Sequence, residues 1–260
     1  MARRSPAPDL ARSIYLLWGH HPSPGRSGLT VPAIVAAGIE IADVDGLDAV
    51  SMRKVADRLG VGAMSLYGHV PGKDDLTALM VDAVYAELYG DDGNGGGDVT
   101  AASRVGDWRA AMRFVAERNW ALYRRHPWLL DIRSSRPTLG PHVSRKYEVE
   151  LRPLDGIGLS DIEMDAALTL VLSHVDSTAR AHRNVSRTRT ESGMSDAEWW
   201  AVVAPVLDQV MADDDLIVSA RIGGAVGAQF DAAQHPEYAL TFGLDIILAV
   251  IEARITSSGP

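Results

Sequence analysis

Residues 51–70 place the strongest constraint on the fold, because two short helical patterns meet there at a glycine. Ser51 is a favourable N-cap for the first helix, and Gly60 accepts the left-handed conformation that commonly ends a helix. Ala56 is small enough for the two helices to cross closely. The space between the helices is filled by Val61 and Leu66. This spacing is typical of a helix-turn-helix, although short helical hairpins of this composition also occur as plain structure.

The rest of the chain also has the helical hydrophobic period, and no segment has the alternation typical of a strand. Ser160 and Ser195 each begin a Ser-X-X-Glu capping box. Caps and apolar spacing predict helices at residues 9–18, 30–45, 51–60, 63–69, 73–88, 107–125, 139–151, 160–187, from 195 onward, and at 236–255. The sequence therefore predicts an all-α fold, in which an N-terminal three-helix helix-turn-helix domain precedes a larger helical bundle.

Composition divides the chain into three parts. Residues 1–28 are rich in Pro, Arg, Ser and Gly and are expected to form a partly flexible extension. Residues 29–75 are expected to form the helix-turn-helix domain, and residues 76–260 are expected to form the larger domain. The glycine-rich segment at 90–100 is expected to be a flexible surface loop, because no strand precedes it and no Gly-Lys-Ser/Thr follows it.

The net charge of the chain is −9, but the distribution of charge matters more than its total. Residues 1–73 carry eight Lys and Arg against six Asp and Glu, so a mildly basic part precedes an acidic remainder. The absence of cysteine excludes disulfides, zinc-thiolate sites and cysteine nucleophiles. No segment has the ~18 apolar residues of a membrane span or the pattern of a secretory signal, so the expected location is the cytoplasm.

The run Gly46–Leu76 strongly resembles the DNA-binding domain of the tetracycline-repressor family, most specifically in Leu-Tyr-X-His-Val-X-X-Lys from Leu66 to Lys73. The second half resembles the same family at His126-Pro127-Trp128, at Ser135-Arg136-Pro137 and in the final helix Tyr238–Leu248. The resemblance covers residues 29–255. It implies a ligand-responsive transcription regulator, a repressor rather than an enzyme, although an activator would have the same pattern.

The resemblance also implies which side chains contact double-stranded operator DNA. Arg53 falls where the family contacts a base or a phosphate, and Ala63, Met64 and Ser65 occupy the leading turn of the recognition helix. Tyr67 and His69 fall at phosphate contacts, and Lys73 lies at the start of the fourth helix.

Some of these residues also have simpler interpretations. Met64 can belong partly to the core, His69 can serve only to cap the helix end, and Arg58 fits a solvated face. Gly68 departs from the family, whose members commonly carry a larger side chain there. It lowers the helix propensity and removes one possible contact.

The family resemblance implies a homodimer whose interface comes from the last helix and the helix at 160–187. Broad apolar faces on the last helix agree with this, at Phe242, Ile246, Ile247, Ala249 and Val250. A twofold dimer presents two recognition helices roughly 34–36 Å apart, which predicts a palindromic operator. The effector is expected to prefer a different spacing of the two DNA-binding domains and so to release the DNA.

A central cavity for a small hydrophobic or amphipathic effector is implied in the same way, although each tryptophan taken singly is more often a core residue. The residues expected to surround it are Trp108, Trp120, Trp128, Arg136 and His174. The position of the family's metal-binding histidine falls at Ile132, which cannot ligate a cation. His174 and His182 are too far apart on one helix to chelate a metal together. The sequence therefore predicts no metal site and no cofactor.

The leading alternative is an all-helical small-molecule-binding protein or metal-dependent enzyme that does not bind DNA. Asp213-Asp214-Asp215 is similar to the acidic clusters of magnesium-dependent prenyl-transfer enzymes, but no second cluster is well placed, and Asp91-Asp92 lie in the glycine-rich loop. A second alternative is a DNA-binding architectural protein without an effector, which should lack a buried cavity. Gly223-Gly-Ala-Val-Gly227 indicates no more than close helix packing.

Overall fold

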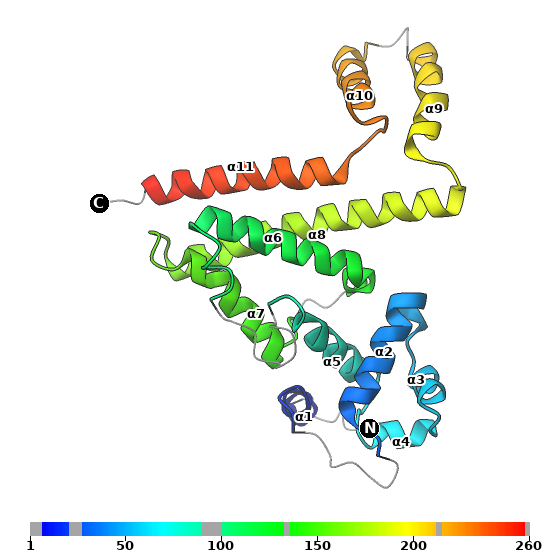
Figure 1. Cartoon of the computed structure of the whole chain (residues 1–260), viewed down its shortest axis with the longest axis vertical. Helices are drawn as coiled ribbons and strands as arrows, with labels where there is room; N and C mark the ends of the chain where they lie inside the picture. The colour runs from blue at the N-terminus through cyan, green and yellow to red at the C-terminus, as the bar shows by residue number, and fades with distance from the viewer. Residues whose placement is uncertain (1–6, 21–27, 90–99, 133–135, 212–214, 258–260) are drawn as a thin grey trace. The chain divides into compact units, whose positions relative to one another are not determined.

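The computed structural model describes residues 7–20, 28–89, 100–132, 136–211 and 215–257. Within these ranges the chain forms helices and no strand, which confirms the all-α prediction (Figure 1). The α-helices are α1 (Ala7–Leu17), α2 (Val31–Asp45), α3 (Met52–Leu59), α4 (Ala63–Tyr67), α5 (Lys73–Tyr85), α6 (Trp108–Arg125), α7 (Pro141–Leu151), α8 (Asp161–Ser192), α9 (Asp196–Val210), α10 (Ile217–Phe230) and α11 (Pro236–Ser257). Three short 3-10 helices are η1 (Leu47–Ala49), η2 (Pro127–Asp131) and η3 (Arg152–Leu154).

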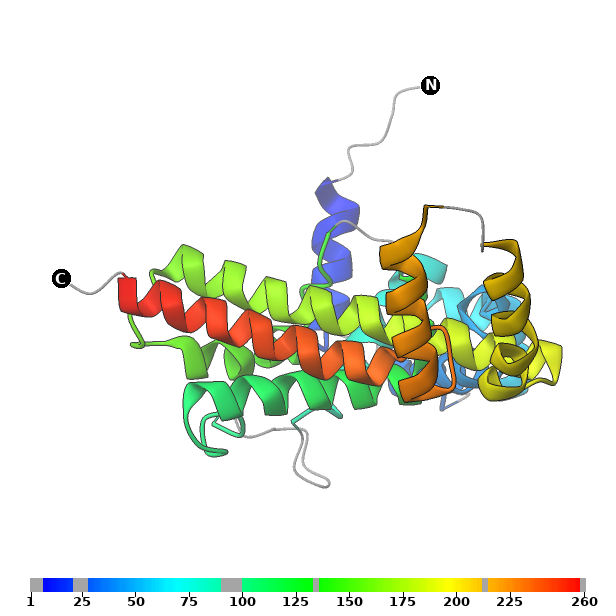
Figure 2. The same ribbon diagram turned by 90° about the horizontal axis from the view of Figure 1, so that it is seen from above.

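The helices group into two compact units. The first comprises Met1–Leu172 and Ala253–Pro260, and the second comprises Ser173–Glu252. Helices α2, α3 and α4, which we call the head, belong to the first unit together with α5, α6 and α7. The second unit contains α9, α10 and the larger parts of α8 and α11, and these two helices run alongside each other in Figures 1 and 2.

The predicted caps set the helix boundaries in the head. The Thr30 hydroxyl accepts a hydrogen bond from the Ala33 N–H at 3.3 Å, and the Ser51 hydroxyl accepts one from the Lys54 N–H at 3.1 Å. Gly60 adopts the left-handed conformation, with φ of 67°, and its N–H bonds back to the end of α3. Because only glycine adopts this conformation without strain, it fixes the tight turn between α3 and α4.

The structure differs from the sequence predictions mainly in the lengths of the helices. Helices α4 and α5 end earlier than predicted, at Tyr67 and Tyr85, and α8 continues to Ser192. Helix α10 was not predicted, because its three glycines lower the helix propensity. At one of these positions, Gly227, the packing requires glycine, since a Cβ there would overlap the Trp200 indole. Residues 90–99 and Asp213-Asp214 lie outside the described residues.

The N-terminal extension contains the predicted short helix, which is part of the first unit. On α1, Leu16 and Leu17 are buried. The Ser13 hydroxyl donates a hydrogen bond to Asp75 at the start of α5, and the Trp18 Nε1–H donates one to the Leu139 carbonyl at 2.9 Å. Helix α1 therefore connects the start of α5 to the segment that precedes α7.

Helices α5 and α7 meet at a buried carboxylate. Asp82 on α5 is 4% exposed and accepts hydrogen bonds from the His142 and Val143 N–H groups, each at 3.0 Å. Burial raises the pKa of Asp82, and the two backbone bonds oppose that shift. Gly140 makes this approach possible, because a Cβ at this position would overlap the carboxylate of Asp82. The backbone itself does not require glycine, since a φ of −86° suits any residue.

We expect Gly140→Ala to lower the free energy of unfolding by about 1–3 kcal/mol, because the new methyl group must displace Asp82 from the first turn of α7. Urea unfolding followed by circular dichroism measures this. Gly224→Ala is the control, since nothing lies within 4 Å of its new methyl group and alanine is the better helix former. Equal losses for the two variants would contradict the assigned role of Gly140.

Candidate functional site

The head places α4 on a well-packed apolar core. The helices α2, α3 and α4 each contribute to this core, and Leu66 points inward from α4. The fully buried side chains include Ile34, Val55 and Leu66 on these helices, and Val50 and Val70 in the segments next to them. Because the inner face of so short a helix is fixed in this way, its remaining residues are held in a defined orientation toward solvent.

The outward side of α4 carries the residues predicted to contact DNA. Met64 is 81% exposed and Tyr67 is 45% exposed, while Ser65 is exposed and Ala63 is half-buried. Met64 is therefore not a core residue, which contradicts that alternative. An exposed helix with small and apolar side chains in its leading turn has the dimensions and chemistry to enter a major groove.

The basic residues of α3 differ in how strongly they are engaged within the head. Lys54 pairs with Asp45 at 2.6 Å, and Arg58 pairs with Glu40 at 2.7 Å. Arg53 has a side chain that is 89% exposed, and its nearest paired acid, Asp57, is 3.9 Å away. Arg53 is thus better placed than Lys54 or Arg58 for a contact outside the protein.

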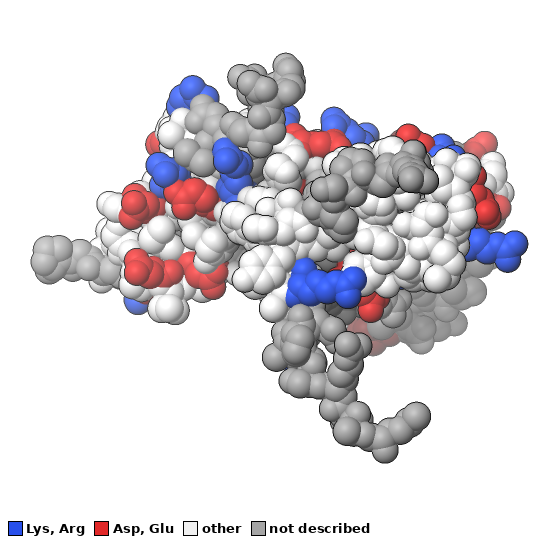
Figure 3. Space-filling view, turned by 90° about the horizontal axis from the view of Figure 1, so that it is seen from below, with Lys and Arg blue, Asp and Glu red and all other residues white. Residues whose placement is uncertain are grey.

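Charge alone does not mark a DNA-binding surface. On the face of the molecule shown in Figure 3, Lys and Arg lie in small groups among acidic and uncharged residues. Lys73 lies at the start of α5, where its ammonium group donates to the Leu47 carbonyl at 3.4 Å. The features that favour a DNA interface are therefore the shape of α3 and α4 and the few exposed side chains there.

The end of α4 borders a hollow of about 310 Å³ against α1, lined among others by Arg12, Tyr15 and His69. The Nδ1 atom of His69 is buried and has no hydrogen-bond partner among the described residues. Gly68 has an ordinary helical φ of −68°, and a Cβ there would make only an ordinary contact. The glycine is therefore not required by the backbone at this position.

A polar junction connects the end of α2 to η2. The Asp43 carboxylate lies 2.7 Å from Nδ1 of His126 and accepts a hydrogen bond from Nε1 of Trp128 at 2.8 Å. The other ring nitrogen of His126 lies 3.3 Å from Glu87, which also pairs with Arg125 at 2.6 Å. The side chains of His126 and Trp128 are buried, so Asp43 satisfies polar groups that have no access to water.

The residues predicted to surround an effector do not all lie together. Trp128 is used in the junction with Asp43, and Trp120 is buried in the core. Trp108 is half-buried beside the guanidinium of Arg109. His174 lies in the second unit, where its Nε2 is 3.0 Å from the Leu240 carbonyl. Their roles in ligand binding stay predictions.

Arg136 does line a cavity, which has a volume of about 260 Å³ and lies within the first unit. Residues of α5, α7 and α8 and the segment before α7 surround it. They are Val81, Tyr85, Ile132, Arg136, Pro137, Thr138, Val143, Lys146, Tyr147, Glu150 and Leu172. Among the described residues, no group of three or more His, Asp or Glu side chains is close enough together to hold a metal ion. The cavity thus combines apolar walls with a few polar groups, as small-molecule sites commonly do.

The buried carboxylate of Glu150 is the main polar feature beside this cavity, and the sequence analysis missed it. Glu150 accepts hydrogen bonds from the Tyr89 hydroxyl at 2.8 Å, from the Asn119 amide at 2.6 Å and from the Lys146 ammonium at 2.5 Å. Burial and the charge of Glu150 raise the pKa of Tyr89 well above its ordinary value. The available signal was the Lys-X-X-X-Glu spacing on α7, which is common on solvated helices.

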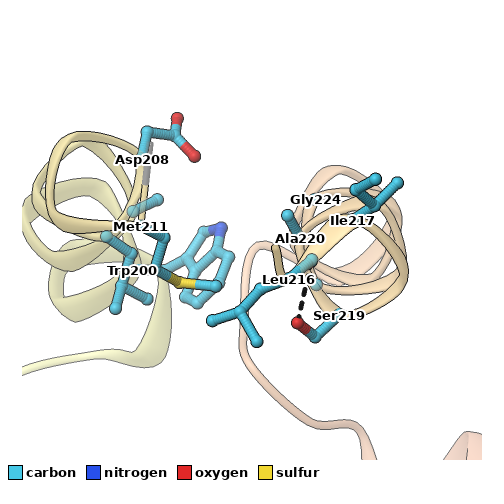
Figure 4. Close-up of a pocket in the computed structure, with 11 residues that line it drawn as sticks. Trp200, Asp208, Met211, Leu216, Ile217, Ser219, Ala220 and Gly224 are labelled. Atoms are coloured by element: carbon cyan, nitrogen blue, oxygen red, sulfur yellow. Dashed lines mark hydrogen bonds between the residues drawn. The ribbon is translucent and has the colours of Figure 1, made fainter. Parts of the chain in front are cut away.

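A larger hollow of about 640 Å³ lies in the second unit between α9 and α10 (Figure 4). The side chains of Trp200, Met211 and Leu216 lie between the two helices in this view. Its polar side chains are Asp208 and Ser219, and the Ser219 hydroxyl donates to the Leu216 carbonyl at 3.0 Å. With so few polar groups to orient a ligand, it is a weaker candidate effector site than the cavity beside Glu150.

Comparison with known families matches two parts of the chain. Residues 34–80 match the family described as bacterial regulatory proteins, tetR family, and residues 101–255 match the tetracyclin repressor-like C-terminal domain. The first match contains α3, α4 and the first part of α5, and the second contains the cavity-lining residues of α7, of α8 and of the segment before α7. No helix among the described residues is long and apolar enough to cross a membrane.

Individual proteins give the same result. The chain is 38% identical over 247 residues to the HTH-type transcriptional repressor DrrR1 of Streptomyces coeruleorubidus, covering 93% of this chain and 87% of that protein. It resembles the crystal structure of apo ActR from Streptomyces coelicolor with a TM-score of 0.68 at 23% identity, covering 92% of this chain and all of that one. The crystal structure of ActR from Streptomyces coelicolor in complex with actinorhodin gives a TM-score of 0.66 at 25% identity, covering 86% of this chain and 96% of that one.

We expect Asp43→Ala to lower the free energy of unfolding by at least about 2 kcal/mol, because it leaves the buried donors of His126 and Trp128 without their partner. Asp45→Ala is the matched control on the same helix. Its pair with Lys54 is about half exposed and should contribute roughly 0–1 kcal/mol. Denaturant titrations of the two variants provide the measurement. A cost for Asp43→Ala no greater than for Asp45→Ala would show that the junction does not stabilise the fold.

Proposed function

Because the chain belongs to the tetracycline-repressor family of transcriptional regulators, we propose that it is a ligand-responsive repressor that binds a palindromic operator as a homodimer. The observation that carries this proposal is the exposed outer side of α4, held on a buried core within the matched DNA-binding region. The relatives are regulators rather than enzymes. Such a repressor would act in the cytoplasm, where it meets DNA.

In this proposal, α4 enters the major groove. Ala63 and Met64 contact thymine methyl groups, and Ser65 bonds a base or a phosphate. Arg53 contacts a guanine edge or a phosphate from the start of α3. The remaining contacts are to phosphates and position the protein without selecting sequence; they come from Tyr67, His69 and Lys73. The high exposure of Arg53 and Met64 supports these assignments.

The homodimer is supported by an apolar stripe on α11. Tyr238, Phe242, Ile246 and Val250 follow one another at intervals of four residues, and each is more than half exposed. Four large apolar side chains on one side of a helix are costly in water, and a second copy of the same stripe would bury them. Two such copies would present two recognition helices to consecutive turns of DNA.

The effector is proposed to bind in the cavity lined by Arg136 and Glu150. Crystal structures of ActR in complex with actinorhodin and with (S)-DNPA support a small-molecule effector for this chain. The cavity also favours an effector-responsive regulator over an architectural DNA-binding protein. A ligand that prefers one spacing of the two heads by several kcal/mol would shift the dimer away from the operator.

We expect Arg53→Ala and Tyr67→Ala each to weaken operator binding by about 1–3 kcal/mol, which is roughly 5-fold to 150-fold. The measurement is fluorescence anisotropy on DNA fragments that flank the protein's own gene, followed by a salt series. Arg58→Ala removes the same charge from α3, but Arg58 is already paired with Glu40, so the loss should be smaller. An equal loss for Arg58→Ala would mean that general charge, not position, determines binding. Failure to select any sequence from a random pool would refute the proposal.

We expect Phe242→Glu to dissociate the dimer, because a dimer would bury the new carboxylate within an apolar interface. Sedimentation velocity at micromolar concentration distinguishes the two states. Val44→Glu is the control, since Val44 on α2 is 80% exposed and lies outside the stripe, and this variant should stay dimeric. A monomeric native protein, or a dimer that tolerates Phe242→Glu, would show that the stripe on α11 is not the interface.

A further inference from the structure

The cavity beside Glu150 has a charge pattern that indicates which class of effector it accepts. We propose that this effector is a small planar aromatic compound that carries an acidic oxygen group, a carboxylate or an acidic phenol, and that Lys146 binds this group. The inference rests on the proposed effector role of the cavity. It adds the chemical class of the ligand and the residue that recognises it.

The anionic group at the cavity, the Glu150 carboxylate, already accepts hydrogen bonds from other side chains of the protein. One oxygen of the Glu150 carboxylate accepts from both Tyr89 and Asn119, and the other accepts from Lys146. The Glu150 side chain is only 1% exposed. Because three donors from three segments of the chain hold this carboxylate in place, its role is to position Lys146 rather than to bind a cationic ligand.

Lys146 retains capacity for a further hydrogen bond. Its side chain is 11% exposed, one N–H of its ammonium group is directed to Glu150, and the group lies 5.5 Å from the centre of the Tyr85 ring. An ammonium group has three N–H donors, of which one is used on Glu150, so a donor remains for an acceptor in the cavity that both residues line. A buried ammonium donor favours a ligand oxygen that carries negative charge.

The lining also contains a second cationic side chain, Arg136, which is exposed and makes an interaction within the protein. The Tyr147 hydroxyl is directed to Asp165 at 2.8 Å, which leaves its ring as a wall of the cavity.

The walls determine the shape of the ligand. Tyr85 and Tyr147 provide two aromatic rings, and Ile132, Pro137 and Leu172 provide apolar surface. A volume of about 260 Å³ is near the lower limit for ligand sites and suits a compound of two or three fused rings.

The test compares three probes of one shape: 2-naphthoate, 2-naphthamide and 2-naphthylmethylammonium. We expect calorimetry on the full chain to show that the acid binds at least about tenfold more tightly than the amide, and that the ammonium compound binds most weakly. Glu150→Gln should increase the preference for the acid, since it removes the opposing negative charge. Lys146→Arg should keep it.

The double variant Lys146→Met/Glu150→Gln removes both buried charges together, so that neither is left unpaired, and it should abolish the preference for the acid. Arg152→Gln, close to α7 and exposed, is the control and should leave the preference unchanged. The inference is wrong if the acid does not bind more tightly than the amide, if it does not bind at all, or if the double variant retains the preference.

Operator binding by the same preparations separates this inference from the function on which it rests. If the native protein binds its operator but shows no preference for the acid, the ligand class is wrong and the repressor function stands. If no operator is bound while the acid preference and its loss in the double variant are observed, the site is correct and the repressor function is wrong.

Discussion

The carboxylate of Asp43 bonds the head to the rest of the first unit, together with the packing of α2 on α5, and we expect the arrangement of the candidate DNA interface to depend on this attachment. The head is small, and its core fixes only the relative positions of α2, α3 and α4. Its attachment at the end of α2 comes from the bonds between Asp43 and the buried rings of His126 and Trp128. Because buried donors without a partner are costly, this attachment has one strongly preferred geometry rather than a range of similar ones.

A carboxylate also joins two helices at two other contacts. Asp82 joins α5 to the first turn of α7, and Glu150 joins α7 to Asn119 on α6. Asp82 and Glu150 are buried, Asp43 is partly exposed, and all three accept hydrogen bonds from a segment distant in sequence. Hydrogen bonds are directional, whereas apolar contacts tolerate small sliding movements, so Asp82 and Glu150 constrain the register of the helices around the cavity.

Local signals in the sequence were sufficient for the helix-turn-helix, because Ser51 and Gly60 act on their own neighbours through the backbone. The effector site was different. The family resemblance implies a cavity near Trp108, Trp120 and Trp128, yet Trp128 serves the junction with Asp43. Lys146 and Glu150 have the spacing of an ordinary surface pair, and only the packing of α5, α6 and α7 makes Glu150 buried. Burial created by distant segments leaves no mark in a local pattern.

The close packing around Asp82 indicates where movement caused by an effector would go. Gly140 already touches the Asp82 carboxylate so closely that not even a methyl group fits, so α5 and α7 cannot approach each other further at that point. An effector in the cavity would press on Val81 and Tyr85, which flank Asp82 on α5. Helix α5 also packs on α2, where Gly38 lets the Met80 side chain lie against the helix backbone. We therefore expect a displacement of α5 to reach the head through α2, whereas a displacement confined to α7 would break the bonds to Asp82 without moving the recognition helix.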